Sequence, residues 1–296
     1  MQFYGIKKLK RKIKNFIKSI LVPINPVLDT KLAYRSAFKS KINLKDPKNL
    51  NEKVLYLKLN DYYNNELVTK CSDKYCIREY LENKGMNDLV PKLYGVYSSV
   101  KDIEWDKLPN SFVVKCNHGC GYNIIVKDKN KENIENDKKL LQKWLKEDYW
   151  KKGEIQYKYI KKKIIIEEYL GDVKTYKFYC FNGEPKIMYI SSNKWENGIC
   201  EKDKYIDFFD MNFNHINCLL KGHPNNPDIV NKPNNFSEMV KISRRLSEDF
   251  PFVRVDLYDV NEKVYISELT FCPTNGFMQI EPENLINEWG IWLKLK

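Results

Sequence analysis

Two stretches of the chain each hold two runs of β-forming residues with a short turn between them. The first, TYKFYCFNGEPKIMYI at residues 175–190, contains Asn182-Gly183, a residue pair typical of a two-residue hairpin turn. The second, FVRVDLYDVNEKVYISELT at residues 252–270, turns within residues 259–262. Each stretch predicts a pair of antiparallel strands, and this constrains the chain to a fold that contains an antiparallel sheet.

The rest of the pattern adds helices and shorter strands. A glycine-containing connection joins two strand candidates, 111–116 and 122–128, and predicts a third hairpin. Helical patterns cover 49–60, 66–84, 132–150 and 233–250, and further strand candidates cover 162–170 and 205–210. Of the 296 residues, 43% are hydrophobic, which is enough to bury a large core. The sum predicts an α+β fold without internal repeats.

Charged and polar residues interrupt the apolar pattern of the second long hairpin. Arg254 and Asp256 are two positions apart and share a face of one strand, and Glu268 and Thr270 share a face of the other. Acids set among apolar residues need a partner or a cation. Two carboxylates on adjacent strands are suitable oxygen ligands for Mg²⁺, which also takes nucleotide phosphates. The alternative is an ion pair between Arg254 and one acid that only holds the hairpin together.

The segment VVKCNHGCG, residues 113–121, allows three interpretations. A zinc site would use Cys116, His118 and Cys120, but three ligands at spacing two do not match the usual paired motifs. A nucleophilic cysteine needs a basic partner, and a histidine two positions away in an extended segment rarely has the right geometry. Neither interpretation is favoured by the spacing.

The third interpretation is a phosphate cradle. The strand delivers Lys115 as a positive charge, while Gly119 and Gly121 let backbone N–H groups of the loop approach an anion. Many hairpins contain two glycines, so this signal is weak alone. The stretch IIIEEYLGD, residues 164–172, adds a buried strand that runs into two glutamates. It can offer backbone groups and one carboxylate to an adenine edge, or it can be a strand end that enters solvent.

Positive charge is concentrated at the start of the chain. The formal net charge is 51 − 39 = +12, and residues 1–20 contain seven of the basic residues and no acid. On a helix, the apolar residues of this segment share one face and most lysines lie opposite, until the prolines of LVPINP (21–26) break the helix. Such a helix is typical of an anionic membrane surface. The alternative is a solvated helix docked on the chain's own domain.

Several classes of protein are not favoured. No apolar run approaches the roughly 20 residues of a membrane-spanning helix, and lysines interrupt the opening segment too often for a secretory signal. The cysteines are scattered without a CxxC pair, so we expect reduced thiols. No recognised nucleic-acid motif is present, so we expect no nucleic acid partner. We expect a cytoplasmic protein, which is peripheral at the inner membrane face under the first interpretation of residues 1–22.

Five motifs occur together in a known order: SDKYCIREYL, FVVKCNHGCGYNII, IIIEEYL, YKFYCFNGEPK and FVRVDLY…YISELTFCPTNGF. In this combination, from about Asn49 to about Glu283, the chain resembles ATP-grasp proteins, and more narrowly the TupA-like family of teichuronopeptide biosynthesis. The resemblance implies two α+β subdomains that hold a nucleotide between them, preceded by a helical N-terminal extension. We expect a basic segment (1–30), a helical region (31–88), a lid subdomain (89–170) and a C-terminal subdomain with the metal site (171–296).

The resemblance also implies how ATP is held. Lys74 and Lys115 would touch the α- and β-phosphates. The loop from His118 to Asn123, which contains Gly119 and Gly121, would close over the triphosphate. The adenine would be lined, mainly by backbone groups, by Glu167, Glu168, Tyr169 and Leu170.

Three further roles follow from the same resemblance. Arg254 and Lys177 would neutralise phosphate charge in the transition state, and the loop with Thr274, Asn275 and Gly276 would present N–H groups to an acyl phosphate. Many ATP-grasp enzymes carry an asparagine where this chain has Thr270. The expected Mg²⁺ ligands are Asp256, Glu268 and Thr270.

ATP-grasp ligases activate a carboxylate as an acyl phosphate, which an amine then attacks, and the family places this reaction in surface-polysaccharide (capsule) synthesis. The resemblance therefore implies an ATP-dependent amide ligase. Its partners would be a uronic-acid-containing glycan or precursor and an amine-bearing small molecule, either an amino acid or an amino alcohol. The alternatives are a sugar kinase on the same fold, a glycosyltransferase, and a non-enzymatic protein that binds a membrane or a polyanion.

Overall fold

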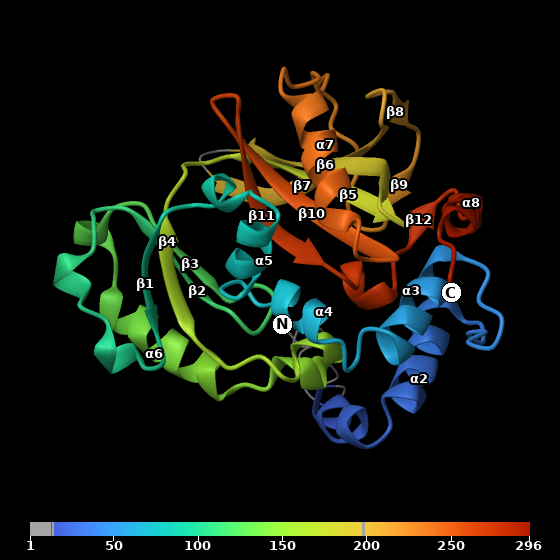
Figure 1. Cartoon of the computed structure of the whole chain (residues 1–296), viewed down its shortest axis with the longest axis horizontal. Helices are drawn as coiled ribbons and strands as arrows, with labels where there is room; N and C mark the ends of the chain where they lie inside the picture. The colour runs from blue at the N-terminus through green and yellow to red at the C-terminus, as the bar shows by residue number, and fades with distance from the viewer. Residues whose placement is uncertain (1–12, 14, 197–198) are drawn as a thin grey trace.

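The computed structural model describes residues 13, 15–196 and 199–296. Two antiparallel sheets lie side by side, with helices packed around them (Figure 1). The four-stranded sheet has the order β1-β4-β2-β3 and is called the lid sheet below; the six-stranded sheet has the order β11-β10-β5-β6-β7-β8 and is called the large sheet. The predicted α+β class is confirmed.

The lid sheet has its own hydrophobic core. Val114, Leu141, Ile164 and Ile166 are fully buried in it, because the Val- and Ile-rich strands turn one face towards α6. Both strand candidates of the expected hairpin are present. The elements are β1 (Leu93–Tyr97), β2 (Phe112–Cys116), β3 (Asn123–Val126), β4 (Ile164–Glu168) and α6 (Ile134–Lys146).

The large sheet contains both long hairpins predicted from the sequence. Asn182 and Gly183 have positive φ angles of 48° and 85°, and Asn261 and Glu262 have 50° and 68°, as two-residue hairpin turns of the mirror-image type require. The helix α7 (Phe236–Ser247) covers one face. The strands are β5 (Lys174–Phe181), β6 (Glu184–Glu196), β7 (Ile199–Asp210), β8 (His215–Ile216), β10 (Phe252–Val260) and β11 (Lys263–Thr270). A two-stranded sheet of β9 (Leu219–Leu220) and β12 (Ile280–Glu281), and the last helix α8 (Asn284–Trp292), complete this part.

The helical region before the lid packs against the large sheet. Leu57, Val68 and Leu81 share one core with Phe178 and Val255 of the large sheet. The helices are α2 (Pro26–Phe38), α3 (Leu50–Asn60), α4 (Glu66–Ser72) and α5 (Ile77–Asn83). The short 3₁₀ turns are η1 (Asn87–Leu89), η2 (Val100–Asp102), η3 (Trp105–Lys107), η4 (Lys129–Lys131), η5 (Tyr149–Lys152), η6 (Ile155–Tyr157) and η7 (Pro273–Gly276).

One predicted helix is divided in two. The pattern at 66–84 predicts a single helix, but α4 ends at Ser72 and α5 begins at Ile77. The Asp73 carboxylate accepts hydrogen bonds from the backbone N–H groups of Tyr75 and Cys76, which stabilises a turn in place of a helical turn. Lys74 lies in this turn and so leaves the helical face on which the sequence places it.

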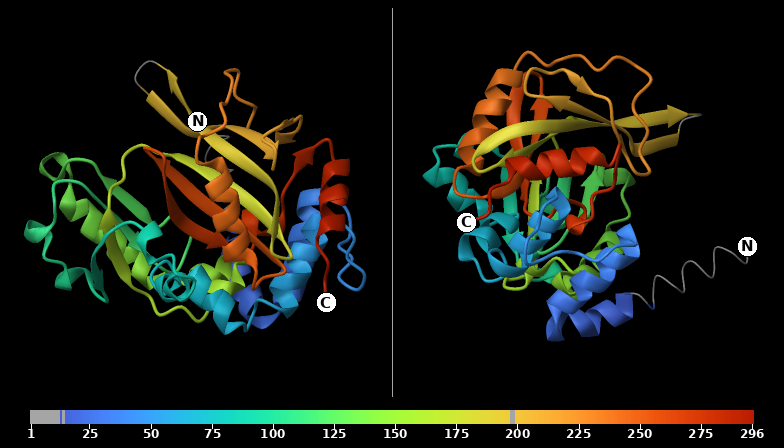
Figure 2. Two further views of the ribbon diagram at one scale, coloured as in Figure 1. Left: turned by 45° about the horizontal axis from the view of Figure 1, so that its top comes forward. Right: turned by 90° about the vertical axis from the view of Figure 1, so that its right-hand side faces the viewer.

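The N-terminal helix ends where the prolines predict a break. Residues 15–24 are helical, and Asn25 caps α2 by accepting a hydrogen bond from the Leu28 N–H, with Pro26 in its first turn. Figure 2 shows these helices at one edge of the molecule. Residues 1–12 and 14, which carry most of the expected basic face, lie outside the described residues. Among the residues that are described, no helix has the length and apolar character needed to cross a bilayer.

Candidate active site

A cavity of about 630 Å³ lies between the lid sheet and the large sheet. Val113 and Ile125 line it from the lid sheet, and Tyr258 lines it from β10. The chain segment that joins the two sheets, residues 168–175, forms another wall. Polar and apolar groups line the cavity in similar measure, which suits a planar, partly polar ligand such as a nucleobase.

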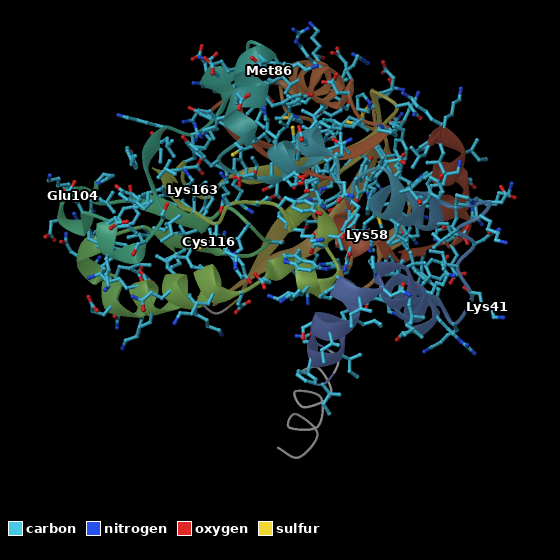
Figure 3. The ribbon with its side chains drawn as sticks, turned by 60° about the horizontal axis from the view of Figure 1, so that its bottom comes forward. Lys41, Lys58, Met86, Glu104, Cys116 and Lys163 are labelled. Carbon is cyan, nitrogen blue, oxygen red and sulfur yellow. The ribbon has the colours of Figure 1, made fainter. Side chains whose placement is uncertain are left out.

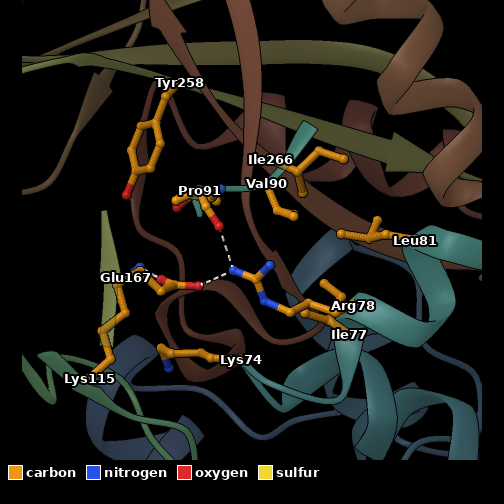
Figure 4. Close-up of a pocket in the computed structure, with 11 residues that line it drawn as sticks. Lys74, Ile77, Arg78, Leu81, Val90, Pro91, Lys115, Glu167, Tyr258 and Ile266 are labelled. Carbon is orange, nitrogen blue, oxygen red and sulfur yellow. Dashed lines mark hydrogen bonds and ion pairs between the residues drawn. The ribbon is translucent and has the colours of Figure 1, made fainter. Parts of the chain in front are cut away.

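Three charged side chains meet in a small separate pocket that shares Pro91, Lys115 and Tyr258 with this cavity (Figure 4). Lys115 donates from Nζ to Glu167 Oε2 at 2.8 Å, and Arg78 donates from Nη2 to Glu167 Oε1 at 2.6 Å and to the Pro91 carbonyl at 2.7 Å. Burial alone raises the pKa of Glu167, but Lys115 and Arg78 outweigh it and hold the pKa below its usual value. Glu167 is therefore ionised and binds two cations at this small pocket.

The loop between β2 and β3 is fastened to the turn that carries Lys74. Lys74 donates from Nζ to the Gly119 carbonyl at 2.5 Å. The buried Asn117 side chain donates to Asp73 Oδ2 at 2.9 Å and accepts from the Lys163 N–H at 2.7 Å. Lys74 and Lys115 thus flank the loop, as a phosphate cradle requires, and Asn117 fixes its position.

Strand register places the residues expected to bind metal and phosphate in a row. β10 lies between β5 and β11, so Asp256 stands opposite Lys177 on one side and opposite Glu268 on the other. Directly opposed residues of antiparallel strands point to the same face of the sheet. Arg254, two positions before Asp256, stands opposite Thr270 and shares that face.

These side chains form one charge network around the fully buried Asp256. Arg254 donates from Nε to Asp256 Oδ1 and from Nη2 to Oδ2, each at 2.6 Å, and Lys177 also donates to Oδ2. Burial alone raises the pKa of Asp256, but Arg254 and Lys177 outweigh it and hold the pKa below its usual value. The ion pair that the sequence leaves as an alternative is thus present, and it adjoins the partly exposed Glu268.

The donor atoms here suit Mg²⁺ in chemical type. Glu268 Oε1 lies 3.4 Å from the Thr270 hydroxyl and 3.7 Å from Arg254, and its side chain is 31% exposed. Asp256 Oδ1 accepts one hydrogen bond and keeps a lone-pair position for another ligand. Two carboxylates and a hydroxyl leave room in an octahedral shell for phosphate oxygens and water, as is usual for Mg²⁺.

The other residues of the VVKCNHGCG segment do not converge. Cys116 is fully buried, and burial raises its pKa to about 12, so it stays a thiol. The His118 ring lies against the lid interior with Nε2 3.0 Å from the Trp144 carbonyl. Cys120 is exposed. Within residues 13, 15–196 and 199–296, no three His, Cys, Asp or Glu side chains are grouped to hold a metal ion. The geometry favours the phosphate cradle over zinc or a nucleophilic cysteine.

Of the four residues expected to line an adenine, three line the large cavity and one does not. Glu168, Tyr169 and Leu170 line the 630 Å³ cavity, and Asn123 lines it from the start of β3. The Glu167 carboxylate instead accepts hydrogen bonds from Lys115 and Arg78. Successive strand residues point to opposite faces, so adjacent glutamates of β4 are separated.

The loop after β11 has an unusual backbone. Thr274 and Asn275 have φ angles of 51° and 56°, a left-handed conformation that non-glycine residues adopt at a cost of order 1–3 kcal/mol. The Asn275 N–H donates to the Cys272 carbonyl at 2.8 Å, so it does not face a ligand as the resemblance implies. Its side chain bridges two elements instead: Oδ1 accepts from Lys58 at 3.4 Å, and Nδ2 donates to the Lys152 carbonyl at 3.3 Å.

Three residues that contact predicted site residues were missed by sequence reasoning. Arg78 lies in the motif SDKYCIREYL, but the turn at Lys74 removes the helical spacing that would relate the two residues. Asn117 lies within VVKCNHGCG, but the interpretations of that segment used only its lysine, cysteines, histidine and glycines. Lys58 has no local signal, because it reaches Asn275 only through tertiary packing.

A model of the TupA-like ATP-grasp family matches residues 52–292. The chain belongs to the TupA-like ATP-grasp family. ATP-grasp enzymes use ATP with Mg²⁺, so both cofactors expected from the resemblance are confirmed, as is the ATP-grasp fold. No curated protein matches the chain significantly.

Several solved structures are similar in fold to this TupA-like ATP-grasp protein. D-alanine–D-alanine ligase from Bacillus anthracis is 16% identical with a TM-score of 0.42, covering 76% of this chain and 60% of its own. L-amino acid ligase from Bacillus licheniformis is 12% identical with a TM-score of 0.44, covering 76% and 47%. D-alanine–D-alanine ligase from Helicobacter pylori is 16% identical with a TM-score of 0.42, covering 83% and 70%. The chain spans only 60% of the first Bacillus anthracis structure and 53% of a second one, which is complexed with ATP. The family assignment depends on the match to the family model.

Proposed function

We propose that this protein is an ATP-dependent carboxylate–amine ligase of surface-polysaccharide biosynthesis. It joins the carboxylate of a uronic acid in a glycan or glycan precursor to an amine of an amino acid or amino alcohol. The observation that carries the proposal is the row Lys177–Asp256–Glu268 with Arg254. The same strands, β10 and β11, also line the small pocket that holds Lys74 and Lys115. A triphosphate with its metal ion needs cations along its length and a carboxylate for the metal. Lys74 with Lys115, and Arg254 with Lys177, are the cations, and the partly exposed Glu268 is the carboxylate.

Each side chain has a distinct task in this proposal. Lys74 and Lys115 hold the phosphates that remain with the nucleotide, and Glu167 keeps Lys115 in position. Arg254 and Lys177 lower the negative charge on the phosphoryl group as it passes to the substrate carboxylate. When bound, Mg²⁺ withdraws charge from the phosphate oxygens, and Asp256 and Glu268 would hold it. The resulting acyl phosphate is attacked by the amine, and phosphate leaves.

The choice of a uronic acid as the carboxylate substrate is based on the net charge of the chain and on its family. The chain carries a net charge of +12, which attracts polyanions such as glycans rich in uronic acid. The N-terminal helix exposes Phe16, Ile17 and Ile20 to solvent, beside a segment rich in lysine. An apolar helix face with basic flanks suits the surface of an anionic membrane, where lipid-linked glycan precursors are found. We therefore place the enzyme at such a surface as a peripheral protein.

The first test is calorimetric titration of MgATP into the wild type and Glu268→Gln, which removes a charge from a partly exposed side chain. We expect saturable binding to the wild type and at least tenfold weaker binding to the variant. Lys48→Met, on an exposed loop, is the control and should bind like the wild type. If the folded wild type does not bind MgATP at millimolar concentration, the proposal that this site binds a nucleotide is wrong.

The second test separates the ligase from the sugar kinase. ADP release is measured with glucuronic acid or glucuronate oligosaccharides, with and without a panel of amines. A ligase gives an amide detectable by mass and needs the amine for sustained turnover. A product phosphorylated on a hydroxyl, formed equally well without amine, assigns the kinase instead.

A further inference from the structure

A second large cavity, of about 650 Å³, lies between α4, α5 and residues 159–163, the segment that leads into β4. It shares no lining residue with the 630 Å³ cavity, and none of the residues expected to bind nucleotide or metal lines it. Tyr75 and Tyr159 contribute aromatic rings to its wall, and Lys161 and Lys163 contribute ammonium groups. The cavity is therefore a site that the proposed nucleotide chemistry does not use.

Two lysines of this cavity are available to an anion. Within the part of the chain that the structure describes, neither Lys161 nor Lys163 forms a salt bridge with a carboxylate. Lys163, labelled in Figure 3, has its Nζ 5.1 Å from the centre of the Tyr75 ring. A cation on a ring face is held in place and still has N–H donors for another partner. These two ammonium groups can therefore bind a carboxylate that is not part of the chain.

Most acidic residues of the cavity already have partners. Glu79 accepts from Lys70 at 2.7 Å. Asp73 accepts from the Asn117 side chain at 2.9 Å and from two backbone N–H groups. Glu66, in the first turn of α4, is exposed. The cavity thus offers two lysines and one exposed carboxylate to a ligand.

Aromatic rings line the cavity and continue beyond it. Tyr159 is 53% exposed, and its hydroxyl donates to Asn64 Oδ1 at 3.1 Å, which orients the ring. Outside the cavity, Lys158 Nζ lies 5.0 Å from the ring centres of Tyr159 and Tyr63 and 5.5 Å from that of Trp150. Rings and ammonium groups are thus interleaved over a surface larger than the cavity itself.

The cavity shares a wall with the phosphate cradle. Asn117, in the β2–β3 loop, donates to the Asp73 carboxylate and to the Lys161 carbonyl, each at 2.9 Å, and accepts from the Lys163 N–H at 2.7 Å. Asp73, Lys161 and Lys163 all line the cavity. A ligand in the cavity therefore lies beside the loop that would hold the phosphates, and outside the reacting centre.

We propose that this cavity binds a non-reacting uronic acid residue of the acceptor glycan. Lys161 and Lys163 pair with its carboxylate, the exposed ring of Tyr159 packs on the C–H face of the sugar, and Glu66 accepts from a hydroxyl. A pyranose has an apolar face and a polar edge, and tyrosine offers the same combination. Binding energy from a part of the substrate that does not react can orient the part that does. This inference rests on the proposed function and narrows its acid substrate to an oligomer or polymer of uronic acid.

The first experiment compares ligands on the full wild-type chain in the absence of nucleotide. Tetraglucuronate and tetragalacturonate are titrated by calorimetry, each against the neutral tetramer of its parent hexose. A single-stranded thymidine oligonucleotide of the same charge is the third ligand. We expect at least one tetrauronate to bind tenfold or more tightly than both controls. Equal binding of the neutral tetramer, or equal or tighter binding of the oligonucleotide, overturns the inference without any variant.

Variants then assign this binding to the cavity. Lys161→Met/Lys163→Met should weaken tetrauronate binding at least tenfold. Lys41→Met/Lys45→Met removes the same charge from exposed residues and should bind like the wild type; Figure 3 shows Lys41 well apart from Lys163. Tyr159→Ala should weaken binding severalfold, whereas Tyr159→Phe keeps the ring and should bind within twofold of the wild type. Equal losses in the two double variants would mean that net charge alone attracts the glycan, which contradicts the site.

MgATP titration separates this inference from the proposed function. Lys161→Met/Lys163→Met should bind MgATP like the wild type, because the backbone groups that bind Asn117 are kept. Loss of MgATP binding in this variant would show that the lysines support the loop, and would contradict the assignment to a glycan. Failure of the wild type to bind MgATP contradicts the proposed function itself. Intact MgATP binding without a preference for a tetrauronate contradicts only this inference.

Discussion

Glu167 shows how one side chain can organise a site without touching the reaction. It is buried on β4 and bound by Lys115 and Arg78, which come from β2 and α5. Glu168, the next residue on the strand, lines the 630 Å³ cavity. The sequence places both in a single role, because adjacent glutamates look alike until the strand separates their faces.

Replacing Glu167 leaves two partly buried cations without a carboxylate. Removing one partner of a buried ion pair typically costs about 3–5 kcal/mol, so we expect Glu167→Gln to lower the free energy of unfolding by about 3 kcal/mol. Urea unfolding followed by circular dichroism measures this. Glu168→Gln on the same strand is the matched control and should change stability by less than about 0.5 kcal/mol. Equal effects of the two changes would contradict the role given to Glu167.

The pKa of Glu167 also predicts a pH dependence. In the folded chain Lys115 and Arg78 hold this pKa below its usual value, which is about 4.3 in an unfolded chain. Its stabilising contribution is therefore complete above the unfolded pKa of about 4.3 and is lost as the pH falls through the lower folded pKa. The stability difference between wild type and Glu167→Gln should be constant from pH 7 to 5 and shrink below pH 4. If this stability difference instead grows as the pH falls, the folded pKa of Glu167 is raised, and the proposed effect of Lys115 and Arg78 is wrong.

At the scale of elements, the β2–β3 loop is defined by two glycines with different surroundings. A Cβ on Gly119 would lie 2.6 Å from the Tyr149 ring and 2.9 Å from Tyr122. Gly121 has φ +73°, but a Cβ there meets nothing within 4 Å. Gly119 thus allows close packing, while Gly121 allows a left-handed turn.

These surroundings predict unequal effects on nucleotide binding. Gly119→Ala must displace the loop from Tyr149 and from Lys74, so we expect MgATP affinity to fall at least tenfold. Gly121→Ala adds backbone strain of roughly 1 kcal/mol and should weaken binding severalfold at most. Calorimetric titration of both variants decides this, with thermal melting to confirm folding. A larger loss for Gly121→Ala would mean that strain, not packing, controls the cradle.

At the scale of the whole molecule, the chain is organised around two hydrophobic cores. The lid core is separate, and the helices from residue 50 to 86 share the second core with the large sheet. The site lies where the two parts face each other. The N-terminal helix stands at an edge, where Lys18 pairs with Asp29 and donates to the Lys152 carbonyl of the lid at 3.2 Å.

The exposed apolar face of that helix predicts membrane association. Phe16 is 67% exposed and Ile17 is 53% exposed. Phe16→Ser/Ile17→Ser should reduce co-sedimentation with vesicles that contain 30% phosphatidylglycerol by several-fold, while MgATP binding stays unchanged. Leu140→Ser, at an exposed apolar residue of α6, is the control. Equal binding of wild type and double variant would place the contact elsewhere.

Local features of the sequence were sufficient for much of the fold. Turn chemistry at Asn182-Gly183 defines one hairpin, because only residues that accept positive φ close so tight a connection. Two-residue spacing puts Arg254 with Asp256, and Glu268 with Thr270, on shared faces. The break at Asn25 follows from proline, which supplies no N–H. These are interactions within a few residues, so composition and spacing determine them.

Only the tertiary structure decided which of these groups meet. The pairing of β5 with β10 sets Lys177 opposite Asp256, and a shift of one residue would turn Lys177 to the other face. Arg78 and Glu167, 89 positions apart, form an ion pair because α5 and β4 approach the same cavity. Lys58 is buried because α3 packs on the η7 loop. Contacts between distant segments depend on register and packing, which no local pattern encodes, and these contacts make the site.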